Sequence, residues 1–400
     1  MIKPREGGIS MTEERQSAIE RPRIYWLDNL RTFMIFLVIV IHAGLVYESS
    51  GISAFFWIVD DPATNDLSGI LNLIIDIFVM STIFFISGFF APLSLKDRKG
   101  LAFLESKFQR LIVPWLIAVL TLIPLYKVIF LYSRSLPQEN WTTYFHWSNG
   151  IWNQNWLWFL PVLFLFNALY LFFSRARIKV PQLSLKAAIW AVGLISLCYS
   201  VCMDVFGLTG WTKTILMDFQ NERILIYFLV FLLGSRCYQL KTFDSDWKCK
   251  RLYILLACTA WIPVMLYLAL VIYSLINPGS HILSQVGDLF LIRLSFLISL
   301  MYLMYLTIST FRKYLNKPGR IGRELSANSY NVYIIHVVVM GGIALAMLNT
   351  GIPSVLKHLL LVVSTYVASN VIISLYRRVN LRFIGAHHGS IDRPLTHREI

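Results

Sequence analysis

Two ionisable residues, Arg31 and His42, stand inside the first apolar stretch of the chain. Ten residues separate them within LDNLRTFMIFLVIVIHAGL. On an α-helix of 3.6 residues per turn, eleven steps bring the second side chain back to within about 20° of the first. Ionisable groups are costly in hydrocarbon unless they face the protein interior, a cavity or a partner. The spacing therefore predicts one helix face that carries both residues, and it makes that face a candidate site.

His42 is the candidate with the clearest chemistry. An imidazole changes charge near neutral pH, so it can take a proton from a substrate hydroxyl and return it to a leaving group. At about 1.5 Å of rise per residue, His42 is predicted roughly 17 Å beyond Arg31, past the bilayer midplane toward the outside. A histidine that only packs through hydrogen bonds is the alternative. Arg31 has its own alternative, in which it reaches the cytoplasmic headgroups with Asp28, one turn earlier, as partner.

The composition indicates what must position these residues. Of the 400 residues, 56% are hydrophobic and only 14% are charged, which is typical of a polytopic membrane protein. We predict an all-α membrane helix bundle of about ten transmembrane spans, each about long enough to cross hydrocarbon. The predicted spans lie near residues 30–47, 70–93, 111–132, 156–173, 187–206, 223–240, 252–273, 288–310, 329–349 and 355–376.

The net charge of +14 would suggest a nucleic-acid partner in a soluble protein, but its distribution indicates topology instead. Lys and Arg gather in alternate connections, whereas residues 47–69 and 274–288 contain none. The positive-inside rule then predicts that both termini are cytoplasmic, and we expect no nucleic-acid binding. The expected domains are a cytosolic tail (1–28), a transmembrane domain (29–376) and a second cytosolic tail (377–400).

Several motifs resemble one family in order along the chain. LDNLRTFMIFLVIVIH resembles the opening signature of the membrane acyltransferase 3 family, whose first span carries an Arg and a His at this separation. MSTIFFISGFF is similar to the family's Phe-rich second span. KFQRLIVPW, with Arg110 and Pro114, resembles its Arg-Leu-x-x-Pro entrance to the third span, and SYNVYIIH its late Ser-Tyr-x-x-Tyr-x-x-His span. These similarities cover roughly residues 23–376.

The fourth span, NWLWFLPVLFLFN, resembles a Trp-Phe-Leu motif of the subgroup that includes the succinyltransferase of osmoregulated periplasmic glucans. Where that subgroup tends to have His-Leu-Trp-Phe-Leu, this chain has Trp-Leu-Trp-Phe-Leu, and it lacks the Glu of many O-acetyltransferases. The resemblance implies a bacterial inner-membrane enzyme that transfers an acetyl, succinyl or similar acyl group from acyl-CoA to a hydroxyl of a cell-envelope saccharide. Acyl-CoA would be a co-substrate. We expect no tightly bound cofactor and no metal.

The donor's phosphates would suit cationic side chains at the cytoplasmic mouth, where Arg31 and Arg110 are predicted. Arg110 is alternatively an ordinary boundary charge. Tyr333 and His336 are three residues apart, so both can project from one side of the ninth span. Because His336 lies only about 10 Å beyond the predicted start of that span, we expect it on the cytoplasmic half, as a donor-site or helix-bridging residue or in structural packing.

Residues predicted near the outer end are candidates for binding the acyl group or the acceptor. Arg293 either receives a carboxylate or hydroxyl there or forms a local packing pair with Asp288, and Asp76 could orient His42. Trp156 and Trp158 belong to an aromatic and amide-rich segment that suits sugars, although Trp and Tyr also populate bilayer interfaces. The other aromatic and histidine members of that segment are Trp141, Tyr144, Phe145, His146, Trp147 and Trp152.

Three classes of function remain open at this point. Under the acyltransferase interpretation, His42 acts either as general base or as a covalent acyl carrier. A transporter or carrier of a saccharide or lipid-linked intermediate would use the same buried His and Arg residues without covalent chemistry. A membrane scaffold for polysaccharide assembly is the third. Ser87 has no nucleophile motif around it, and Gly88 predicts close helix packing. The sequence leaves the oligomeric state open.

Overall fold

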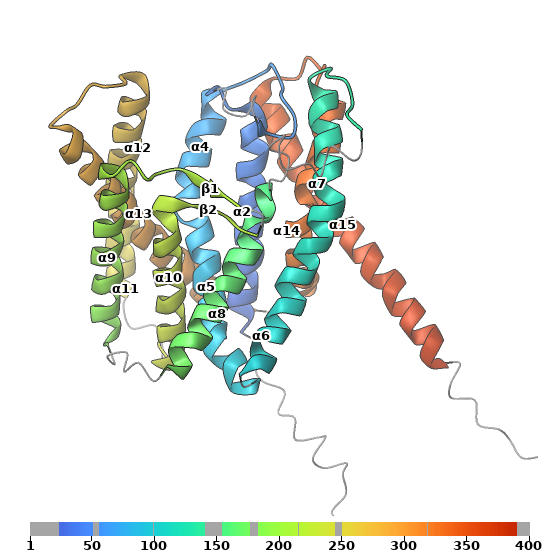
Figure 1. Cartoon of the computed structure of the whole chain (residues 1–400), viewed down its shortest axis with the longest axis horizontal. Helices are drawn as coiled ribbons and strands as arrows, with labels where there is room; N and C mark the ends of the chain where they lie inside the picture. Colours follow the sequence, from blue (N-terminus) through green and yellow to red (C-terminus); the bar gives the residue numbers. More distant parts are fainter. Residues whose placement is uncertain are drawn as a thin grey trace, which may run out of the picture.

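The computed structural model describes residues 24–50, 56–98, 100–140, 154–176, 183–214, 216–244, 250–317 and 319–389. Helices make up nearly all of the regular structure in these ranges, which confirms the all-α membrane bundle (Figure 1). In chain order the elements are α2 (Tyr25–Tyr47), α4 (Asp66–Asp76), α5 (Val79–Asp97), α6 (Leu101–Lys107), the π-helix η1 (Phe108–Ile112), α7 (Val113–Ser133), the 3-10 helix η4 (Asn155–Trp158), α8 (Phe159–Arg175), α9 (Leu185–Val205), β1 (Trp211–Lys213), β2 (Asp218–Gln220), α10 (Asn221–Gln239), α11 (Lys250–Thr259), α12 (Trp261–Ile276), α13 (Gln285–Tyr314), α14 (Arg320–Met347) and α15 (Ser354–Gly389).

Nine helical segments among the described residues are long and apolar enough to cross a membrane. The remaining predicted span, residues 223–240, corresponds to α10, which has a similar length but is more polar because it carries Glu222, Arg223 and Arg236. Two predicted boundaries differ from the structure. α14 begins at Arg320 rather than near Ser329, and α15 continues to Gly389 rather than ending near 376. Polar first and last turns lower the local hydropathy without preventing helix formation. The orientation of the termini relative to the membrane stays a prediction.

The helix that carries the first motif lies at the centre of the bundle. α2 contacts α4, α5, α13, α14 and α15, and Figure 1 shows it in dark blue among them. Because neighbours cover most of its circumference, a polar side chain on α2 meets protein rather than lipid.

α2 and α14 run in the same direction and are held together at two levels. Near their beginnings, Arg31 Nη2 donates to the carbonyl oxygen and the hydroxyl of Ser326, at 3.4 and 3.2 Å. Eleven residues further along α2, the ring of His42 lies 2.7 Å from that of His336. One face of α2 therefore carries both Arg31 and His42 toward α14, as the spacing predicted.

α5 and α10 pack antiparallel at very short range. A Cβ atom placed on Gly88 would lie 1.9 Å from the Phe231 carbonyl oxygen, and one on Gly234 would lie 2.2 Å from that of Phe85. Only glycine permits this approach, so the predicted packing role of Gly88 is confirmed. α8 packs against this pair, with Phe166 in contact with Phe228 and Phe231 of α10.

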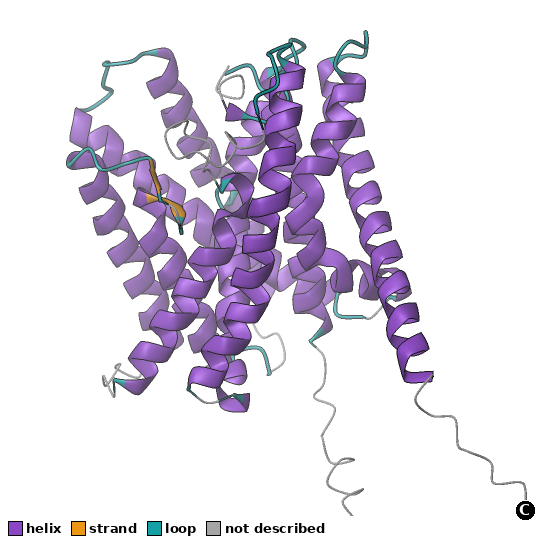
Figure 2. Ribbon diagram, turned by 45° about the vertical axis from the view of Figure 1, so that its right-hand side comes forward, coloured by secondary structure: helices purple, strands orange, loops and turns teal. Residues whose placement is uncertain are grey.

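The outer flank of the bundle is built from α9, α11 and α12 against α13. Large apolar side chains there are open to the surroundings, for example Trp190, Leu194 and Trp261. Such a surface fits contact with lipid. Between α9 and α10, β1 and β2 form an antiparallel hairpin with Lys213 opposite Asp218; Figure 2 shows it in orange at one side of the helices.

Candidate active site

The centre of the candidate site is a pair of histidines in a defined hydrogen-bond chain. His336 is fully buried, and its Nδ1 lies 2.7 Å from the Tyr333 carbonyl oxygen. A carbonyl only accepts, so this nitrogen carries the proton of the neutral ring. His336 Nε2 is then an acceptor, and His42 Nδ1 must donate to it across 2.7 Å. The remaining nitrogen, His42 Nε2, is left with its lone pair available.

His42 lies on the wall of a cavity of about 390 Å³ near the end of α2. Its volume lies within the range of small-molecule sites. The wall combines indole rings with an amide, a lysine and a carboxylate. The lining residues are His42, Leu45, Phe56, Trp57, Asn155, Trp156, Trp158, Trp211, Lys213 and Asp218. A chamber that adjoins the His42 ring and carries both aromatic and hydrogen-bonding groups can hold a polar, ring-shaped substrate.

Trp57 lines this cavity and lies against His42. Its Nε1 donates to the His42 carbonyl oxygen at 2.9 Å, and the two rings are 4.9 Å apart between centroids. Arg134 Nη2 donates to the Trp57 carbonyl oxygen at 3.0 Å, and the Tyr126 hydroxyl donates to that of Phe56. The segment before α4 is thereby fixed from two directions, and Trp57 limits how far the imidazole can turn.

Trp156 joins the short helix η4 to α14 by two reciprocal bonds. Its indole Nε1 donates to the Ile334 carbonyl oxygen at 2.9 Å, and the Tyr333 hydroxyl donates to the Trp156 carbonyl oxygen. Both residues are almost completely buried. Tyr333 thus acts as a structural link whose carbonyl orients His336, and its hydroxyl is engaged within the protein. Trp158 lies next to it on the wall and meets Trp211 edge to face.

The hairpin closes the cavity through Asp218. Its two carboxylate oxygens accept from the backbone N–H groups of Gln154 and Thr214, each at 3.1 Å. Burial raises the pKa of Asp218, while these two bonds and the nearby Lys213 ammonium lower it in part. The carboxylate ties the hairpin to the start of η4 and so fixes the spacing between Trp158 and Trp211.

Arg31, near the start of α2, and Arg110, in η1, both lie at the opposite end of the bundle from this cavity. Arg31 is paired with Asp28 at 3.2 Å, so the expected local partner is confirmed. Arg110 lies in η1, and its exposed side chain does not reach the cavity. Pro114 has no N–H to donate to the Arg110 carbonyl, which instead accepts from the Tyr330 hydroxyl of α14 at 2.5 Å. The Arg-Leu-x-x-Pro motif therefore anchors α14.

The predicted depth of His336 was wrong. We expected it on the cytoplasmic half and His42 beyond the bilayer midplane, whereas the two rings are in contact. The reason is the earlier start of α14 at Arg320, which places His336 about 24 Å along the helix axis. The helix-bridging role expected for His336 is what the structure shows.

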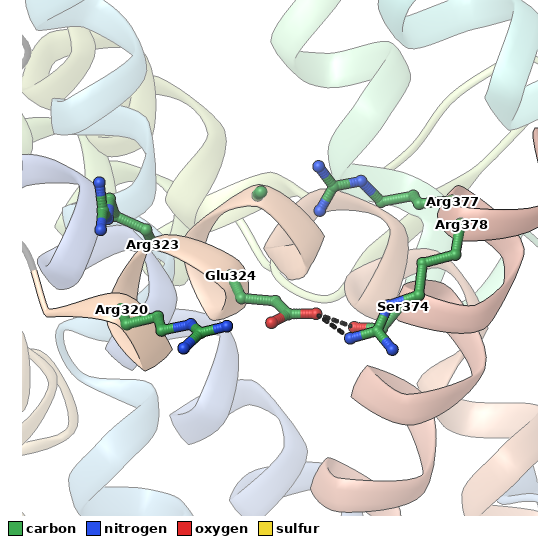
Figure 3. Close-up of a pocket in the computed structure, with 7 residues that line it drawn as sticks. Arg320, Arg323, Glu324, Ser374, Arg377 and Arg378 are labelled. Atoms are coloured by element: carbon green, nitrogen blue, oxygen red, sulfur yellow. Dashed lines mark hydrogen bonds and ion pairs between the residues drawn. The ribbon is translucent and has the colours of Figure 1, made fainter. Parts of the chain in front are cut away.

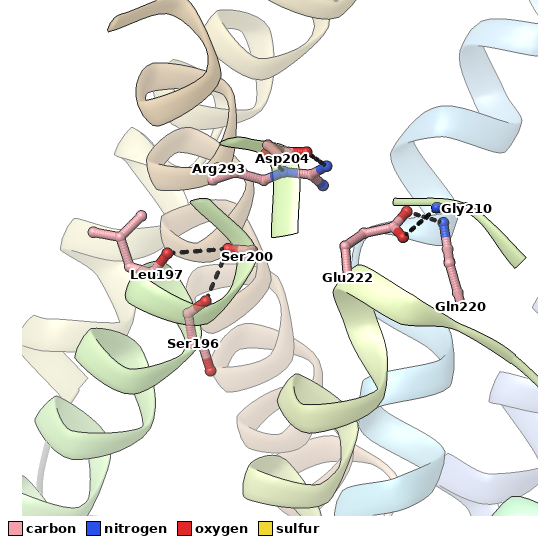
Figure 4. Close-up of polar contacts among 8 residues, drawn as sticks. All are labelled: Ser196, Leu197, Ser200, Asp204, Gly210, Gln220, Glu222 and Arg293. Atoms are coloured by element: carbon pink, nitrogen blue, oxygen red, sulfur yellow. Dashed lines mark hydrogen bonds and ion pairs between the residues drawn. The ribbon is translucent and has the colours of Figure 1, made fainter. Parts of the chain in front are cut away.

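Two charged candidates have partners other than those expected. Asp76 Oδ2 accepts from Arg223 Nη1 at 2.5 Å, so it does not orient His42. Arg293 does not pair with Asp288; it binds both oxygens of Asp204 on α9 at 2.5 and 2.6 Å (Figure 4). The Asp288 carboxylate instead accepts from the Ile282 and Leu283 N–H groups. Which helices are neighbours decided both pairings, and sequence spacing within one helix does not give that information.

Other parts of the site were missed or lie beyond what is described. Trp57, Trp211, Lys213 and Asp218 were not predicted, because a short turn and a three-residue strand carry no distinctive pattern. The six further aromatic and histidine candidates between 141 and 152 lie outside the described residues. Within the described ranges, no three His, Cys, Asp or Glu side chains converge as a metal site.

Glucans biosynthesis protein C from Salmonella schwarzengrund is 29% identical to this chain over 151 residues, which are 37% of this chain and 38% of that protein. The corresponding proteins of Salmonella typhi and Salmonella paratyphi B are 29% and 28% identical over the same shares. The chain thus matches well under half the length of these relatives. No solved structure matches significantly.

A family profile covers far more of the chain than these relatives do. The acyltransferase 3 profile, described as an acyltransferase domain, matches residues 24–376. That range begins one residue before α2 and includes every element of the cavity and the histidine pair. This protein therefore belongs to the acyltransferase 3 family of multi-pass membrane proteins.

Proposed function

We propose that this protein transfers an acyl group from acyl-CoA to a hydroxyl of a cell-envelope saccharide in the bacterial inner membrane, with His42 as general base. The observation that carries the proposal is the chain from His42 Nδ1 to His336 Nε2 and from His336 Nδ1 to the Tyr333 carbonyl, next to the indole-lined cavity. This chain of hydrogen bonds leaves His42 Nε2 as the one basic nitrogen of the pair, and the cavity can bring a hydroxyl to it.

The proton and bond changes balance without a further reactant. His42 Nε2 takes the proton of the acceptor hydroxyl as its oxygen attacks the thioester carbonyl carbon. The carbon–sulfur bond then breaks, and the imidazolium returns the proton to the departing thiolate. While His42 is charged, His336 continues to accept from its Nδ1–H, which stabilises the imidazolium and holds the ring in place.

The composition of the cavity wall supports a saccharide as the acceptor. Indole faces pack against the apolar C–H faces of sugars, while the Asn155 amide, Lys213 and Asp218 can bond hydroxyl groups. The cavity lies at the end of α2 that the charge distribution predicts to be outside. The relatives' name, glucans biosynthesis protein C, is consistent with a glucan-type acceptor. The donor would approach from the other end, where the cationic residues gather.

The test uses the purified full chain in detergent with isotope-labelled acetyl- and succinyl-CoA. Saccharide fractions from the cell envelope serve as acceptors, and mass spectrometry of the product identifies the acyl group. We expect acceptor-dependent transfer by the wild type and loss of transfer in His42→Gln. His281→Gln is the matched control, because His281 is exposed near Asp288 and remote from the cavity. A hydroxylamine-sensitive acyl-protein that needs His42 would replace the general base by a covalent carrier. Uptake of unmodified saccharide that survives His42→Gln, without transfer, would favour the carrier class.

A further inference from the structure

A second pocket, rich in arginine, lies at the opposite end of the bundle from the indole-lined cavity. It has a volume of about 420 Å³ and lies between the first turns of α14 and the later part of α15. Figure 3 shows Arg320, Glu324 and Arg378 projecting from the two helices toward the space between them. Its polar lining consists of Arg320, Arg323, Glu324, Ser374, Arg377 and Arg378.

The positive charge of this pocket is only partly compensated. Glu324 is the one acidic residue of the lining, and it accepts from Ser374 Oγ at 2.9 Å and lies 3.7 Å from Arg378 Nη2. Arg320 and Arg323 make no side-chain hydrogen bond or ion pair with another of the described residues. Four guanidinium groups against one carboxylate leave a strong excess of donors for an anion.

A buried polar residue next to the pocket holds two of the lining side chains, Ser374 and Arg377. Asn328 is completely buried, and its carbonyl accepts from Arg377 Nη1 at 2.8 Å while its amide donates to Ser374 Oγ at 2.8 Å. A neutral partner orients Arg377 without cancelling its charge. Ordinary boundary arginines need no such support, because they reach the headgroups on flexible stems. The arrangement is that of a prepared anion site.

The beginning of α14 adds further donors. The helix starts at Arg320, and its cap residue Gly319 provides no side-chain bond to the first turn. Unsatisfied N–H groups and the positive end of the helix dipole favour phosphate at such a position. We propose that this pocket binds the phosphate groups of a ligand, through Arg320, Arg323 and Arg377.

The proposed acyl transfer names the preferred source of the phosphates, and this part of the inference rests on that function. Coenzyme A carries its phosphates and its thioester at opposite ends of a long arm. From Glu324 to His336, α14 advances about 18 Å, and Arg31 bonds to the helix between these levels. A donor phosphate held here would let the arm follow the α2 and α14 contact toward the histidines. An anionic phospholipid headgroup presents the same phosphate chemistry.

The experiment measures binding and does not depend on turnover. Calorimetry on the purified full chain in uncharged detergent compares coenzyme A, inorganic pyrophosphate and phosphate-free pantetheine. The test variant is Arg320→Gln/Arg323→Gln, and the matched control is Lys250→Gln/Arg251→Gln, which removes the same charge from an exposed turn at the same end. Co-purified anionic phospholipid is quantified by mass spectrometry for each protein.

We expect coenzyme A and pyrophosphate to bind about tenfold more weakly to the test variant, with pantetheine unchanged and the control like the wild type. Unchanged coenzyme A binding with less co-purified anionic lipid than in the control would keep the phosphate site and assign it to a headgroup. If neither coenzyme A binding nor the amount of co-purified anionic lipid falls further in the test variant than in the control, the proposal is overturned. Normal phosphate binding in a protein without acyl transfer would overturn the proposed function alone.

Discussion

The histidine pair and the Asp204–Arg293 pair are two kinds of buried polar contact in one bundle, and they differ in what they leave unused. Both carboxylate oxygens of Asp204 accept from Arg293, so each charge faces its opposite. In the pair between α2 and α14, each bond fixes the next, and one nitrogen of His42 remains beside a cavity. A nitrogen that stays available beside a cavity, more than burial of an ionisable group, distinguishes the candidate chemistry of His42 from the packing role of Arg293.

Energetics give the same contrast. A buried ion pair roughly breaks even against apolar packing, yet removal of one partner is strongly destabilising because the other charge is stranded. A neutral imidazole pair has no stranded charge, so a substitution there is expected to impair chemistry more than folding. The two regions therefore predict opposite mutational signatures.

The largest expected effect is on the histidine pair. We expect His42→Ala to lower kcat about 1000-fold and His336→Ala about 100-fold, because the second residue acts through the first. The double variant should be no slower than His42→Ala alone, since residues of one chain are not additive. Steady-state rates with labelled donor measure this, and thermal unfolding in detergent checks folding. Additive losses would mean that the two histidines act independently.

The second prediction tests the contrasting region. Arg293→Met strands the Asp204 carboxylate, so we expect a loss of about 3 kcal/mol in stability with kcat unchanged. Thermal unfolding in detergent and the transfer assay, run on the same sample, separate the two effects. Asp204→Leu/Arg293→Met should regain most of the stability. A large fall in kcat with normal unfolding would return Arg293 to the acyl or acceptor site.

Much of the fold and the centre of the site could be predicted from the sequence, because hydropathy and helical periodicity act within one segment. The helix face shared by Arg31 and His42 follows from an eleven-residue step, and the close approach at Gly88 follows from a missing side chain. Both predictions concern residues whose environment is set mainly by their own helix.

Other features depend on which elements meet, and periodicity does not provide that. The contact of His336 with His42 needed the true start of α14, which lies in a polar segment. The pairing of Arg293 with Asp204 needed the knowledge that α13 lies against α9. Lys213 and Asp218 reach the cavity through a hairpin of two three-residue strands, too short to leave a pattern.

The third prediction concerns Trp57, which lies against His42. Trp57→Phe keeps an aromatic ring near His42 but removes the bond from Nε1 to its carbonyl oxygen. We expect kcat to fall about fivefold, because one hydrogen bond is worth about 1 kcal/mol, which corresponds to about that factor in rate. Stability should change little, because the aromatic ring is retained. Trp190→Phe is the matched control, because Trp190 lies on the exposed face of α9. Equal rates in both variants would show that Trp57 does not position the imidazole of His42.

The smallest expected effect is pH-dependent and concerns acceptor binding. Burial raises the pKa of Asp218, so its carboxylate takes up a proton at a higher pH than an ordinary aspartate does. Protonation converts one of the two carboxylate oxygens that accept from the Gln154 and Thr214 N–H groups into a hydroxyl. This weakens the hold on the hairpin beside Trp158. The acceptor KM should therefore rise about two- to threefold as the pH falls through this raised pKa. Asp218→Asn has an amide nitrogen, which cannot accept a hydrogen bond, in place of one carboxylate oxygen at every pH. Its KM for the acceptor substrate should therefore be raised already at neutral pH and should not change as the pH falls. Asp244→Asn, a substitution of an exposed aspartate in the turn after α10, should retain the wild-type profile. Identical profiles for Asp218→Asn and the wild type would separate the hairpin from acceptor binding and leave the histidine pair as the part of the cavity that responds to substitution.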